Sequence, residues 1–251
     1  NNADDVWSGM FLVNNVSDET TNAWNGDDRA FKGGGLTIDG GLLEWWGYPT
    51  IRKLNEYISR IAESTLPDEI RNVKLAEGRF LRAMCYFAMV KRYGGIPLIL
   101  QVQDVKDPEE VLYPKRDSEQ TIYDFVIGEV DDIFMDLPET MTGANLGRPS
   151  RYAALALKSR AALYAGSIAQ YGEIQLDGLL GIPADRANHY YQESLDASEK
   201  IVAGGKHGLY EKYPDDRVLN YQSLFTDKHN IEVIWARDHN SVRFTDGGLG
   251  I

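Results

Sequence analysis

Apolar side chains recur every three to four residues over most of the chain from residue 49 onward, which is the spacing of one helix face. The first such stripe consists of Ile51, Leu54, Ile58 and Ile61. Charged residues occupy the remaining faces, and Pro49 suits the first helical turn, where its missing N–H has no helical partner. The pattern predicts a short amphipathic helix over residues 49 to 61.

A longer helix is predicted from Asp68 to Tyr93, and it is apolar over much of its circumference. Its main stripe consists of Ala76, Phe80, Ala83, Phe87 and Val90. A helix of this kind packs against neighbours on several sides. Gly94 and Gly95 predict its end, and Pro97 predicts an extended segment after it.

Three further helices follow from their capping residues and apolar spacing. One is predicted to open at Asp117, with Gln120 completing a capping box, and to end before Pro138. The next is rich in alanine and has Ser150 as its N-cap. The last is expected over residues 189 to 203.

Two other patterns concern strands and charges. Residues 231 to 236 are short and β-branched, which predicts a strand. The third helix carries four acidic residues, Glu129, Asp131, Asp132 and Asp136. Their spacing matches no known metal-binding loop, so we expect a solvated helix face.

Paired helices with small and aromatic residues resemble tetratricopeptide units, although the connections over residues 94–116 and 172–188 are long. The sequence therefore predicts a mainly α fold, an α/α superhelix of tetratricopeptide-like helix pairs with long loops and little strand. An ordinary helical bundle is the alternative. Because no low-complexity linker divides the chain, we expect one domain over residues 1–251.

Charge and composition exclude several classes of partner. The net charge of −12 repels polyanions, and no cluster of lysine and arginine offsets it, so nucleic acid is not an expected partner. Anionic membranes are disfavoured unless a lipid provides the anchor. The single cysteine, Cys85, lies in an apolar helical stretch, which predicts a buried structural thiol.

Catalytic motifs are absent from the sequence. It contains no glycine-rich phosphate loop, His-x-x-x-His pair, cysteine pair or nucleophile elbow, and its four histidines (His189, His207, His229 and His239) lie in polar contexts. A glycosidase would need two carboxylates, one with a raised pKa, and no acidic residue is predicted in an apolar setting. We therefore predict a protein that is not an enzyme and has no cofactor or metal site.

One weak alternative to this prediction is a calcium site in the loop before residue 116. The candidate ligands would be Asp104, Asp107, Glu109 and Glu110, although their spacing is not that of an EF-hand.

Residues 76–87 (AEGRFLRAMCYF) and 92–98 (RYGGIPL) resemble the most recognisable stretch of the SusD/RagB family of Bacteroidetes. Further segments are similar to the family pattern in the same order along the chain. They are residues 16–19, 48–61, 113–117, 147–157 and 230–235.

The resemblance implies a lipid-anchored protein on the cell-surface face of the outer membrane. Such a protein captures glycans and acts as the lid of a SusC-like TonB-dependent transporter. A peptide ligand, as in RagB-type members, and a tetratricopeptide-type scaffold are the alternatives. Family members are commonly about twice as long and carry an N-terminal lipidated cysteine, so we expect a chain truncated at both ends.

Glycan binding needs flat aromatic rings that stack on sugar C–H faces, with amide and carboxylate groups beside them for the hydroxyls. Two clusters before the first predicted helix have this composition. They are Trp24, Asn25 and Asp27, and Trp45, Trp46 and Tyr48. The second cluster could instead anchor the start of the helix, whereas the pair Tyr190 and Tyr191 is expected to pack between helices.

Overall fold

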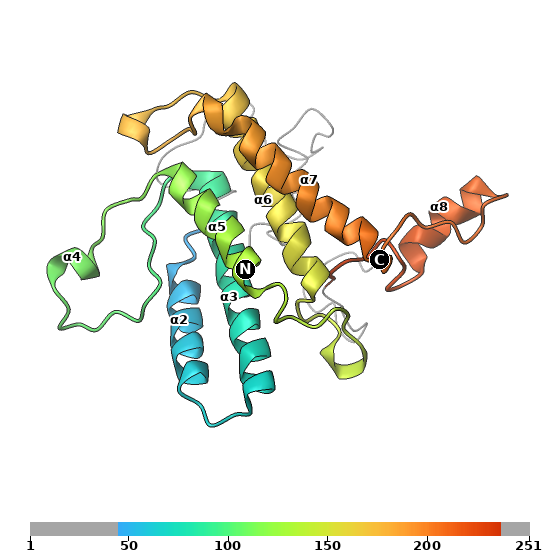
Figure 1. Ribbon diagram of the computed structural model, residues 1–251, viewed down its shortest axis with the longest axis horizontal. Coiled ribbons are helices and arrows are strands. Elements are labelled where there is room, and N and C mark those ends of the chain that lie inside the picture. Colours follow the sequence, from blue (N-terminus) through green and yellow to red (C-terminus); the bar gives the residue numbers. More distant parts are fainter. Residues whose placement is uncertain (1–44, 237–251) are drawn as a thin grey trace, which may run out of the picture.

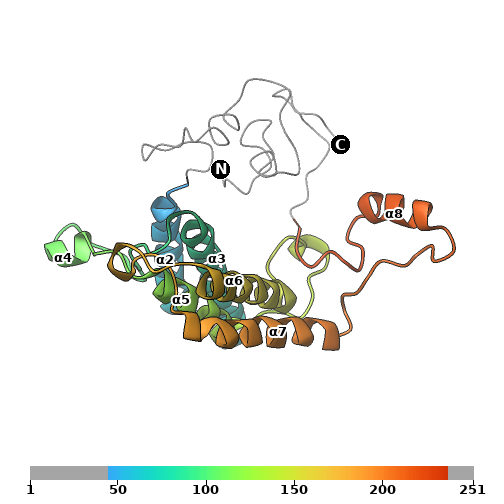
Figure 2. The ribbon, with the colours of Figure 1, turned by 90° about the horizontal axis from the view of Figure 1, so that it is seen from above.

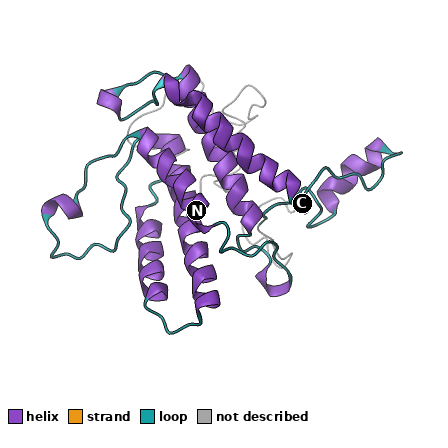
Figure 3. Cartoon of the chain, viewed as in Figure 1, coloured by secondary structure: helices purple, strands orange, loops and turns teal. Residues whose placement is uncertain are grey.

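The computed structural model describes residues 45–236, and this part of the chain is mainly helical with no strand (Figures 1 and 3). Its α-helices are α2 (Tyr48–Ala62), α3 (Asp68–Tyr93), α4 (Glu109–Leu112), α5 (Glu119–Ile133), α6 (Arg151–Tyr171), α7 (Ala187–Ala203) and α8 (Arg217–Thr226). Three short 3-10 turns lie at Gly143–Asn145, Leu176–Gly178 and Ala184–Arg186. The predicted mainly α fold is confirmed.

Helices that follow one another along the chain pack side by side, from α2 and α3 through α5 and α6 to α7 (Figure 1). Small residues allow the closest approaches. Ala161, Ala162 and Ala165 of α6 are fully buried, and the Tyr191 ring of α7 lies against Gly166. Helix α8 projects away from this layered body (Figure 2).

Two helix caps test the sequence interpretation. The hydroxyl of Ser150 accepts from the N–H of Ala153, as expected for the N-cap of α6. The predicted opening at Asp117 is wrong, because α5 begins at Glu119 and Ser118 is its N-cap. The Asp117 carboxylate instead accepts from the backbone N–H of Leu98.

The predicted strand over residues 231–236 is also wrong. Asn230 turns the chain there, with its side-chain oxygen accepting from the N–H of Glu232 and its carbonyl accepting from Val233. Trp235 then lies edge-on to Phe80. A strand needs a neighbour to pair with, and the described part of the chain offers none.

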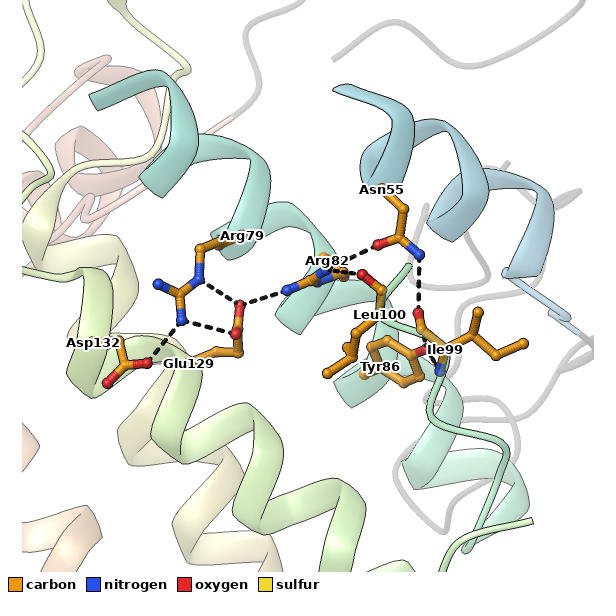
Figure 4. Close-up of polar contacts among 8 residues, drawn as sticks. All are labelled: Asn55, Arg79, Arg82, Tyr86, Ile99, Leu100, Glu129 and Asp132. Atoms are coloured by element: carbon orange, nitrogen blue, oxygen red, sulfur yellow. Dashed lines mark hydrogen bonds and ion pairs between the residues drawn. The ribbon is translucent and has the colours of Figure 1, made fainter. Parts of the chain in front are cut away.

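The extended connection after α3 is held by buried polar side chains of α2 and α3 (Figure 4). The amide of Asn55 donates to the carbonyls of Ile99 (3.0 Å) and Gln101 (3.1 Å). The Tyr86 hydroxyl donates to the Ile99 carbonyl (3.0 Å) and accepts from its N–H (2.7 Å). Arg82 donates to the carbonyl of Leu100. These bonds replace the strand pairing that an extended segment otherwise requires.

Glu129 corrects the expectation of a solvated acidic face on α5. Its carboxylate is buried and accepts from Arg79 and from Arg82, which also donates to the Asn55 side chain (Figure 4). Asp132, one turn further on, is exposed and pairs with Arg79. The spacing that suggested a solvent-facing stripe includes one residue facing the helix interface.

Replacing Glu129 with glutamine should destabilise the protein by about 3 kcal/mol or more, because it leaves the Arg82 guanidinium buried without its counter-charge. Asp132→Asn is the matched control, since its side chain is 67% exposed and its pair with Arg79 contributes about 1 kcal/mol at most. Urea unfolding of both variants measures the difference. Equal losses of unfolding free energy would show that the buried pair contributes no more to stability than the exposed pair.

Glu119 corrects a second expectation, that no acidic residue lies in an apolar setting. It is 8% exposed, and one carboxylate oxygen accepts from the N–H of Gly181 (2.7 Å). Burial raises the pKa of this carboxyl, and the hydrogen bond only partly opposes the rise. This hydrogen bond fixes the loop before α7 on the first turn of α5.

This raised pKa predicts a pH dependence of stability. The carboxyl is more easily protonated in the folded chain, so its contribution is fully present below the usual value of 4.5 and is lost as the pH rises through the folded pKa. Glu119→Gln keeps an acceptor for Gly181 and does not titrate. From about pH 4 to about pH 7, its unfolding free energy should rise relative to the parent protein. A constant difference would contradict the assignment.

Candidate ligand-binding surface

Trp46 is the exposed member of an aromatic group at the start of α2. Its side chain is 51% exposed, although two tyrosine rings hold it. The ring centroids of Tyr48 and Tyr93 lie 5.0 Å and 5.1 Å from it, at interplanar angles of 55° and 80°. These are favourable tilted and edge-to-face contacts. The indole is therefore fixed in orientation while much of its surface faces solvent.

Trp45 and Tyr48 are partly buried and pack against the hydrophobic core. The backbone N–H of Trp45 donates to the Tyr93 hydroxyl (2.8 Å). The Tyr48 hydroxyl donates to the carbonyl of Pro97 (2.5 Å), and burial raises its pKa above the usual range. Trp45 and Tyr48 therefore anchor the start of α2, which was the alternative interpretation. Trp46 is the exposed ring of the cluster.

Sequence reasoning missed Tyr93, the last residue of α3. Its position in the RYGG segment was visible, but only the fold brings residue 93 next to residue 46. The chain turns directly after it at Gly94, whose φ of 64° favours glycine. The aromatic group is therefore built from both ends of a helix pair, by α2 at its start and α3 at its end.

Gly47 allows this arrangement, because a Cβ at this position would come within 2.5 Å of the Trp45 ring. Its N–H also donates to the sulfur of Met89 (3.3 Å). An alanine at this position must displace the Trp45 indole.

Gly47→Ala should therefore lower the unfolding free energy by about 1–3 kcal/mol. Gly128→Ala in α5 is the control: a Cβ there meets nothing within 4 Å, and alanine favours the helix by up to about 1 kcal/mol. Thermal unfolding distinguishes the two. If both substitutions stabilise the chain, Trp45 is not confined as described.

Some of the remaining candidate residues lie outside the described residues, and the others have structural roles. Trp24, Asn25 and Asp27 lie outside the described residues, as does His239. Tyr190 is fully buried and its hydroxyl donates to Asp124. Tyr191 packs against the core, so the expectation that this pair packs between helices is confirmed.

The structure places the other candidate chemical groups as follows. Cys85 is buried, as predicted, and burial raises the pKa of its thiol to about 11. Within residues 45–236, no three His, Cys, Asp or Glu side chains gather as a metal site would require. Asp104 and Asp107 accept backbone N–H groups of their own turn. None of the helices described is long and apolar enough to cross a membrane.

Layered helix pairs place the chain among helical-repeat proteins, and its surface includes a fixed, half-exposed indole. Comparison with known proteins identifies the family of the chain. Residues 8–163, more than half of the chain, match the SusD-like family described as starch-binding and associating with the outer membrane. The chain belongs to this family.

Individual relatives agree with this assignment. A SusD-like protein of Formosa agariphila is 25% identical over 70% of this chain and 28% of its own length. A SusD-like structure from Bacteroides fragilis is 29% identical, with a TM-score of 0.60 over 78% of this chain and 33% of that one. A laminarin-binding SusD-like protein shares the fold at 21% identity, with a TM-score of 0.60 over 82% and 40%.

These relatives confirm the tetratricopeptide-like helical architecture, and they are longer than the chain described here. The chain spans about a third of the length of the relatives it matches, between 28% and 40%.

Proposed function

We propose that this chain is the N-terminal helical part of a SusD-like domain that captures glycans at the cell surface, with Trp46 as a sugar-stacking residue. The observation that carries the proposal is the combination of exposure and fixed orientation at Trp46. The proposed whole protein is lipid-anchored at the outer face of the outer membrane. It acts as the lid of a SusC-like TonB-dependent transporter.

Physical reasoning supports a sugar ligand at this surface. The apolar C–H face of a pyranose stacks on an indole, while its hydroxyl groups remain hydrated or bond to nearby polar groups. A ring already held by Tyr48 and Tyr93 loses little rotational freedom on binding, so more of the contact energy contributes to affinity. A relative with the same fold binds laminarin, which is a glycan.

The proposed mechanism is binding and release, without bond breaking. The carboxyl of Glu119, which is buried and has a raised pKa, accepts the backbone N–H of Gly181 in the loop before α7. Its role in the fold explains its burial. Substrate would be trapped between lid and barrel, and it would pass inward once the transporter is energised.

Trp46→Ala should weaken oligosaccharide binding about tenfold or more, since a central aromatic contact commonly contributes 2 kcal/mol or more. It also removes the two ring contacts with Tyr48 and Tyr93, so it should lower the unfolding free energy by about 1–3 kcal/mol. Titration calorimetry of the whole protein with laminarin and maltodextrin oligosaccharides measures the affinity.

Tyr171→Ala is the matched control, because Tyr171 is a 76% exposed aromatic residue at the end of α6. It should bind the same oligosaccharides as the parent protein does. If Trp46→Ala binds them with unchanged affinity, Trp46 is not the stacking residue. If only peptides bind, the alternative ligand class replaces glycans.

A further inference from the structure

The guanidinium of Arg116 is fixed at the end of the loop that returns to α5. Its Nε donates to the carbonyl of Gly95 (2.7 Å), and its Nη2 donates to the carbonyl of Tyr93 (2.8 Å). Two bonds to rigid carbonyls determine the orientation of this planar group, while the residue as a whole stays exposed. Arg116 is therefore a positioned cation on the surface.

Three observations place this cation beside the aromatic group. One of its bonds goes to Tyr93, whose ring contacts Trp46. The other goes to Gly95, two residues or roughly 7 Å of extended chain from the Pro97 carbonyl that holds Tyr48. Burial is the main cause of the raised pKa of Tyr48; the Asp117 carboxylate adds to the rise, and the charge of Arg116 acts against it. The guanidinium is thus within electrostatic reach of that phenol.

Arg116 forms no ion pair within residues 45–236, although the chain has 38 acidic residues. Arg52, Arg71 and Arg148 each pair with a carboxylate, whereas Arg151 resembles Arg116 in donating to two backbone carbonyls. The adjacent Asp117 is half-buried, and its carboxylate accepts from the N–H of Leu98. Nη1 of Arg116 has no acceptor in this part of the chain and is available to a ligand oxyanion.

We propose that the Trp46 surface prefers glycans that carry oxyanions, namely the carboxylates of uronic acids or sulfate esters, and that Arg116 is the residue that selects them. The inference rests on the proposed glycan-binding function and adds a substrate class to it. The aromatic ring stacks on the apolar face of acidic and neutral sugars alike. The fixed guanidinium supplies a charge-assisted hydrogen bond that a neutral sugar cannot match. This local contact acts against the chain's net charge of −12, so the expected ligands are short oligosaccharides with few oxyanions rather than long polyanions.

The test compares each acidic oligosaccharide with its neutral counterpart. Uronic-acid oligosaccharides are titrated against the same molecules with methyl-esterified carboxyls, and sulfated oligosaccharides against desulfated ones. The whole protein should bind one of the acidic forms roughly threefold to tenfold more tightly, as expected for one charge-assisted hydrogen bond at a partly exposed site. This preference should fall as salt rises, while binding of the neutral form should not.

Arg116→Gln should remove the preference, so that this variant binds the acidic and the neutral form of an oligosaccharide with equal affinity. Lys115→Gln is the matched control, because it changes net charge equally at the neighbouring exposed position and should retain most of the preference. The salt dependence of the parent protein needs no variant, so it tests the preference for acidic glycans even if Arg116→Gln folds poorly.

Several outcomes would overturn the inference. Equal binding of acidic and neutral forms at low salt would do so and leave the proposed function standing. An equal loss of both forms in Arg116→Gln would assign the residue to positioning the turn after α3. If neither form of any oligosaccharide bound, both the inference and the proposed function would fail.

Discussion

The structure depends on one constraint, which is that the extended connection after α3 must satisfy its backbone groups without a neighbouring strand. Side chains of the two preceding helices solve this problem, with Asn55 from α2 and Tyr86 and Arg82 from α3 bonded to consecutive stretches of the connection. A buried arginine in this role needs a counter-charge, and Glu129 of α5 provides it. Three helices and a loop are thereby fixed by one polar network.

The aromatic surface also depends on this network, at the end where the connection leaves α3. Tyr48 bonds to Pro97 at the beginning of the same connection, and Tyr93 closes α3 just before it. With these two rings fixed, Trp46 is oriented without being buried. Rigidity created for folding thus also provides a preorganised contact for a ligand, which is the usual way in which a scaffold supports a binding site.

Local patterns in the sequence predicted the helices well. The ends of α3 at Asp68 and Tyr93 followed from apolar spacing and the glycines beyond them, and Ser150 was recognised as a cap. The strand expected over residues 231–236 failed because strand formation depends on a partner elsewhere in the chain. Helix α8 was not predicted at all.

The candidate surface was predictable only in part, for the same physical reason. Composition indicated that Trp45, Trp46 and Tyr48 belong together, since they are neighbours in sequence. It could not separate the anchors from the exposed ring, because their burial depends on Tyr93 and the core. Likewise, helical spacing placed Glu129 among its acidic neighbours, whereas only packing against α3 reveals its two arginine partners.

The proposed role of this helical chain is nutrient capture together with a transporter. It is tested most directly by purifying the full-length protein from its native outer membrane under mild detergent and identifying what accompanies it. We expect a large TonB-dependent β-barrel transporter in stoichiometric amount. Recovery of the protein with soluble helical-repeat partners and no such transporter would contradict it, and would favour a scaffold that shares this fold.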